Sequence, residues 1–85
     1  MRLPKTVNVG GGHKVKVVLL TSKQLRGIMN GTEVNGCWVH TPDQKMDGLI
    51  CIDKNLKARD RWSVYWHELI HAINDISAYD TGLST

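Results

Sequence analysis

The feature that most constrains the fold is a long stretch near the C-terminal end that contains neither glycine nor proline. It runs from Asp60 to the residue before Gly82, in a chain of 85 residues. Such a stretch predicts a helix over residues 60–78, with Asp60 as its N-cap. Its apolar side chains fall on one broad face at helical spacing, and we expect them in the core: Trp62, Tyr65, Trp66, Leu69, Ile73 and Ile76.

Shorter apolar segments, rich in β-branched residues, predict a sheet for that helix to pack on. The predicted strands cover residues 6–9, 14–20, 34–41 and 48–53. Thr21 and Ser22 are predicted to cap a short helix over residues 23–29. The expected fold class is therefore α+β, with a mixed or antiparallel sheet of about four strands packed on the long C-terminal helix, plus one short helix.

Three consecutive glycines, Gly10 to Gly12, separate the first two predicted strands. A hairpin turn explains them, since glycine adopts the positive φ angles that such turns need. A phosphate-binding loop is the alternative, but no Gly-Lys-Ser/Thr sequence ends the run and no helix follows directly. We predict the hairpin.

Length and charge limit the classes of function. With 85 residues the chain is expected to form one domain, residues 1–85. The net charge is +3, and the basic residues are scattered from Arg2 to Arg61 without forming a cluster. We therefore expect a solvated surface and no nucleic-acid partner. No apolar run suits a membrane span, and Met1 to Lys5 lack the apolar stretch of a secretion signal, so the expected location is the cytoplasm.

Both cysteines, Cys37 and Cys51, lie in predicted strands. A cross-strand disulfide is geometrically conceivable, but a reducing compartment disfavours it. We expect two free, buried thiols.

A separate polar stripe of the long helix carries the residues that suggest chemistry. His67, His71 and Asp75 follow one another at steps of four, with Glu68 on the flank of the stripe. Residues 67–71 fit the H-E-x-x-H pattern, in which two imidazoles one turn apart bind a single tetrahedral zinc ion. The carboxylate beside the first histidine then acts as general base toward a zinc-activated water. We therefore predict His67 and His71 as zinc ligands and Glu68 as the catalytic base.

On these residues the chain resembles the zincin metallopeptidases, especially the minimal gluzincin-like and ImmA/IrrE-like domains. The resemblance is centred on residues 66–73 and extends over about residues 34–75. It implies a peptide or protein substrate, a bound Zn²⁺ and hydrolysis of a peptide bond. It also implies that the strand holding Cys37 to His40 is a sheet edge along which an extended peptide docks.

The third zinc ligand stays open, because neither the metzincin nor the thermolysin-type pattern follows His71. Asp75 is the first choice, although a straight helix carries it about 6 Å beyond His71 along the axis. Asp80, just before the chain can turn at Gly82, is the second choice. His40 is a third, as a ligand or as a donor to the developing oxyanion. No role is expected for His13.

Two other functions remain open from the sequence. One is a non-catalytic, zinc-stabilised module for protein interaction or regulation, which a closed four-ligand shell would favour. The other is a small regulator that binds nucleic acid or a repressor. Trp62 and Trp66 are expected in the core, whereas Trp38 is left between core packing and a substrate groove. Because few residues follow the helix, we expect weak or restricted activity, or a protein partner that completes the cleft.

Overall fold

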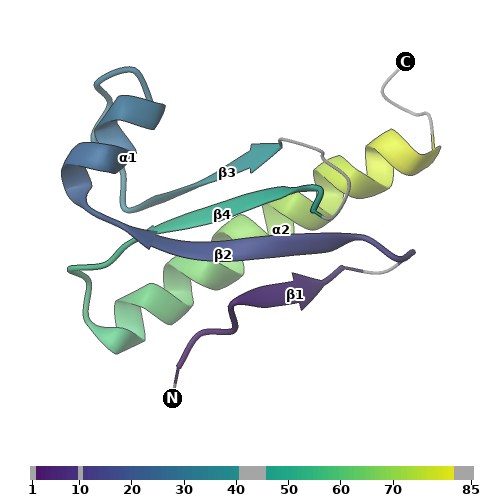
Figure 1. The fold of residues 1–85 in the computed structure, drawn as a ribbon, viewed down its shortest axis with the longest axis horizontal. Helices are drawn as coiled ribbons and strands as arrows, with labels where there is room; N and C mark the ends of the chain where they lie inside the picture. The colour runs from purple at the N-terminus through teal and green to yellow at the C-terminus, as the bar shows by residue number, and fades with distance from the viewer. Residues whose placement is uncertain (1, 10, 41–45, 82–85) are drawn as a thin grey trace.

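In the part of the chain that is described, four strands and two helices follow one another (Figure 1). The computed structural model describes residues 2–9, 11–40 and 46–81, and of residues 79–81 it describes the backbone alone. The elements are β1 (Thr6–Asn8), β2 (Lys14–Leu20), α1 (Ser22–Ile28), β3 (Gly36–His40), β4 (Gly48–Asp53) and α2 (Ala58–Thr81). The predicted α+β class, with four strands and a long C-terminal helix, is confirmed. None of the helices within these residues is both long and apolar enough to cross a bilayer.

The four strands form one mixed sheet in the order β1-β2-β4-β3. β1 and β2 pair antiparallel, β2 and β4 pair parallel, and β3 and β4 pair antiparallel. Among the described strands β3 therefore lies at one edge of the sheet, which is the place that the resemblance implied for the segment from Cys37 to His40.

The turn between β1 and β2 is the predicted hairpin. Gly11 and Gly12 have φ angles of 60° and 80°, a region that side chains strongly disfavour, and the Val9 amide donates to the His13 carbonyl at 3.0 Å. Gly10 lies outside the described residues. The His13 Nδ1 lies 2.9 Å from the Asp47 carboxylate, so this histidine ties the hairpin to the segment before β4.

Helix α1 begins with a reciprocal cap. The Gln24 amide donates to the Thr21 hydroxyl at 3.1 Å, and the Thr21 amide donates to the Gln24 side chain at 2.9 Å. The helix starts at Ser22, one residue before the predicted start, and its buried Leu25 packs on the sheet face opposite α2 together with Cys37 and Cys51.

The buried face of α2 differs from the predicted one. It is a row at spacings of four, three and four that packs against apolar side chains of β2 and β4, namely Tyr65, Leu69, Ala72 and Ile76. Trp62 is half-buried beside this row. Trp66 and Ile73, predicted in the core, are 55% and 38% exposed, so that prediction is wrong for both. The reason is that one sheet face covers a narrower arc of the helix than its apolar residues occupy.

The start of α2 also differs from the prediction. The Arg61 amide donates to the Lys57 carbonyl at 2.9 Å, which is already a helical bond, and the helix begins at Ala58. Asp60 is therefore not the N-cap. It lies within the first turn, where a carboxylate still interacts favourably with the helix dipole.

The two cysteines face each other across the β3–β4 pair. Cys37 and Cys51 are register partners, and both are free and buried, as predicted. Burial raises the pKa of the Cys37 thiol. Burial, together with the neighbouring Cys37, raises the pKa of Cys51 to about 12. Both thiols are therefore held in the protonated, unreactive form.

We expect the folded protein to resist thiol reagents. At a pH of about 8 an ordinary cysteine is partly thiolate, whereas these two stay protonated because their pKa values are raised. After reduction and removal of the reductant, Ellman's reagent should react slowly with the native protein and rapidly with both thiols in concentrated urea. Equally fast reaction in the two conditions would contradict the buried pair.

Candidate metal centre

The polar stripe of α2 lies beside the edge strand β3, and the two elements touch closely at Gly36. A Cβ added at Gly36 would overlap the Val64 side chain and lie 2.8 Å from the Cys51 carbonyl oxygen. Only glycine lets the helix approach the strand this far. The contact brings the turn of α2 that contains His67 and Glu68 next to the start of β3.

His67 and His71 are brought together on the exposed side of the helix. Their Nε2 atoms are 3.2 Å apart, and the rings meet edge to face at a centroid distance of 4.7 Å. Two nitrogens that share one tetrahedral zinc at 2.0 to 2.1 Å are separated by about 3.3 Å. Without metal, the same approach lets one neutral ring donate a hydrogen bond to the other. The two side chains therefore need little rearrangement to bind one ion together.

Glu68 lies between the histidines and the sheet. It is half-buried, while both histidines are exposed. A shallow hollow of about 290 Å³ opens here between the start of β3 and α2, lined by Asn35, Gly36, Ser63, Val64, His67 and Glu68. The carboxylate and one imidazole thus face a common space, which has room for a small part of a substrate.

Asp75 makes a contact that the sequence did not predict. Its Oδ2 accepts a hydrogen bond from the Trp38 Nε1 at 2.7 Å. The Trp38 ring is half-buried against the core that α2 forms, so it links the middle of β3 to a later turn of the helix. The signal that would have found this contact is the position of Trp38 on a strand beside a helix stripe that ends in a carboxylate.

The third ligand is not decided by the geometry. Among the side chains that the structure describes, those of residues 2–9, 11–40 and 46–78, no three histidines, cysteines, aspartates or glutamates form a group suited to one metal ion. Within that range, neither Asp75 nor His40 joins the two histidines. The His40 ring stacks on Trp38 at a centroid distance of 6.1 Å. The side chain of Asp80 lies outside the described residues.

Comparison of the chain with protein-family models, with curated proteins and with solved structures gave no match.

We expect Gly36→Ala to destabilise the protein by about 1–3 kcal/mol, because the added methyl group forces β3 away from Val64. The free energy of unfolding in urea measures the effect. Gly27→Ala is the matched control, since nothing lies within 4 Å of an added Cβ there and alanine favours its helix. If Gly36→Ala were as stable as Gly27→Ala, β3 and α2 would not be in close contact.

Proposed function

We propose that this chain is a zinc-dependent metallopeptidase-like protein that hydrolyses a peptide bond, with Glu68 as its general base. The observation that carries the proposal is the 3.2 Å approach of the His67 and His71 Nε2 atoms, with Glu68 beside them at a hollow next to an edge strand. The two imidazoles fit a zinc ion in chemistry and spacing, and a catalytic zinc would need a third protein ligand besides them. Cytoplasmic location remains a prediction.

His67 and His71 would hold the ion. When bound, zinc supplies an acidified water and a Lewis acid for the carbonyl oxygen of the substrate. Both rings are on one helix that is anchored by its buried row, so their spacing is maintained by the backbone. A rigid pair of ligands lowers the entropic cost of metal binding.

Glu68 would move the proton. Its carboxylate accepts a proton from the water that attacks the carbonyl carbon, and then donates it to the nitrogen as the C–N bond breaks. The products are a carboxylic acid and an amine. Partial burial suits this task, because a carboxylate that is shielded from bulk water interacts more strongly with the positive charge that develops on the attacking water.

The outer edge of β3 would position the substrate. One edge of β3 pairs with β4, and along its other edge the described residues supply no strand. An extended peptide added there gains backbone hydrogen bonds, as in β-augmentation, and passes the hollow beside Glu68.

Asp75 is the third ligand that we test first. Carboxylates that bind metals are usually held by an outer hydrogen bond, and the Trp38 indole supplies one to Asp75. Its other carboxylate oxygen would then be free to hold the ion. Asp80 and His40 are the alternatives.

We expect the parent protein to bind one Zn²⁺ per chain, and His67→Ala and His71→Ala each to weaken binding by more than about 100-fold, since each removes a ligand. Competition with a chromophoric chelator measures the affinity. His13→Ala is the control, because His13 pairs with Asp47 away from the stripe. Zinc affinity that is unchanged by His67→Ala or His71→Ala would refute the centre.

Two Asp75 variants separate ligation from its bond to Trp38. Asp75→Asn keeps an oxygen for the indole but weakens a metal ligand, whereas Asp75→Ala removes both. If Asp75 binds zinc, both variants lose affinity. If both variants bind zinc like the parent, Asp75 is not a ligand and only holds β3 through Trp38. The zinc affinity of Asp80→Ala and of His40→Ala would then be measured in the same way.

We expect Glu68→Gln to retain zinc and to lose hydrolysis by about 10²- to 10⁴-fold, since the amide cannot accept the proton. A degenerate peptide mixture, incubated with the zinc-loaded protein in H₂¹⁸O, reports cleavage by mass spectrometry as new ¹⁸O-labelled C-termini. Equal rates for Glu68→Gln and the parent would refute the mechanism. Zinc binding without cleavage by the parent would favour the non-catalytic module.

A further inference from the structure

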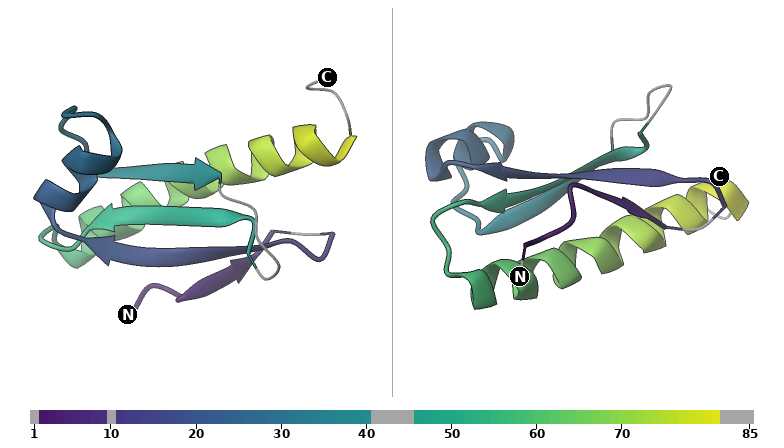
Figure 2. Two further views of the ribbon diagram at one scale, coloured as in Figure 1. Left: turned by 45° about the horizontal axis from the view of Figure 1, so that its top comes forward. Right: turned by 60° about the horizontal axis from the view of Figure 1, so that its bottom comes forward.

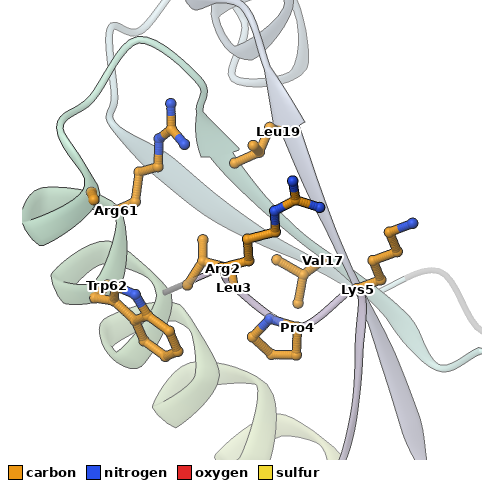
Figure 3. Close-up of a pocket in the computed structure, with 9 residues that line it drawn as sticks. Arg2, Leu3, Pro4, Lys5, Val17, Leu19, Arg61 and Trp62 are labelled. Atoms are coloured by element: carbon orange, nitrogen blue, oxygen red, sulfur yellow. The ribbon is translucent and has the colours of Figure 1, made fainter.

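A second hollow lies on the other side of α2, away from the histidines. A cavity of about 330 Å³ opens between the N-terminal segment, β2 and the first turns of α2 (Figure 3). It shares no lining residue with the hollow beside Glu68. Its size is at the lower end of the range for small-molecule sites.

The floor of the cavity is apolar surface that α2 does not cover. Along β2, the residues on the side of α2 are Val15, Val17 and Leu19, and their exposed fractions rise from 0% through 9% to 44%. Figure 2 (right) shows the first turns of α2 standing off from the sheet. Leu19 on β2 and Trp62 on α2 both line the cavity, together with Leu3 and Pro4 of the N-terminal segment.

The mouth of the cavity is cationic. Of the nine described residues that line it, Arg2, Lys5 and Arg61 carry positive charges and none is acidic. Arg61 is held in place, because its Nε donates to the Leu56 carbonyl at 2.9 Å and its Nη2 donates to the Lys54 carbonyl. These acceptors are neutral, so they orient the guanidinium and leave its charge uncompensated. A cation that is already oriented loses little entropy when an anion binds.

We infer that this cavity binds a small organic carboxylate with an apolar tail. The tail would cover Leu19 and the face of Trp62, and the carboxylate would lie among Arg2, Lys5 and Arg61. A neutral apolar molecule matches the floor alone, and a hydrophilic polyanion matches the mouth alone. Only a molecule with both parts satisfies the two surfaces together.

Three probes with one apolar chain and different head groups test the inference: octanoate, 1-octanol and octylammonium. The readout is the ¹H–¹⁵N signal of the Trp62 indole, assigned with Trp62→Phe. The Trp38 indole, which contacts Asp75, monitors binding near the histidines in the same spectrum. His67→Ala is run in parallel, so that a carboxylate bound to metal is not counted.

Octanoate should shift the Trp62 signal in a saturable way, in the parent and in His67→Ala, while the other two probes bind at least about fivefold more weakly. Arg2→Gln and Lys5→Gln should each weaken octanoate by about three- to tenfold, as expected for loss of one charge at a partly exposed mouth. Lys23→Gln, an exposed lysine on α1, is the matched control and should have no effect.

Three results would overturn the inference. The first is no saturable shift with octanoate. The second is binding of 1-octanol as tight as that of octanoate. The third is equal weakening by Lys23→Gln and by the two mouth variants.

Discussion

The row of buried side chains on α2 determines where every other part of that helix lies. Tyr65, Leu69, Ala72 and Ile76 pack against one face of the sheet, and this packing fixes the rotation of the helix about its axis. At 100° per residue, the flank on one side of the row carries Glu68 and Asp75 and the other carries Trp66 and Ile73. The polar flank meets β3, whereas the apolar flank faces solvent. A different rotation would bury the histidines or move them away from the edge strand.

Two contacts then hold the edge strand to that polar flank. The close approach of Gly36 to Val64 fixes the start of β3, and the hydrogen bond from Trp38 to Asp75 fixes its middle. Because β3 pairs with only one strand among the described residues, these contacts supply constraint that a second strand would otherwise give. These contacts join β3 to α2, and the hollow beside Glu68 lies between the two elements. The stability of the β3–α2 contact and the chemistry of the proposed centre are therefore linked.

Local patterns predicted the elements well because each depends on neighbours in the sequence. The glycine turn, the cap at Thr21 and the apolar run of β4 all lie where the sequence predicted. The rotation of α2 was only partly predictable, because apolar residues occupy more of its circumference than the sheet covers, and Trp66 is as apolar as Tyr65. The start at Ala58 escaped prediction since Asp60 is a good cap by residue type alone.

The angle between α2 and the sheet explains features that the sequence did not predict. Near the start of α2 the side chains that pack on the sheet core are large, Tyr65 in the buried row and Trp62 beside it, whereas Ala72 further along is small. Since the size of the contacting side chains sets the distance between packed elements, the large aromatic groups hold the first turns away from β2, and Ala72 lets later turns approach. A wedge of space results at the end of β2, where Leu19 stays exposed and the cationic cavity forms. The inclination of α2 to the sheet also determines how near Asp75 comes to β3. The position of Asp75 and the second cavity thus both depend on the inclination of α2 to the sheet, which no short segment of the sequence encodes.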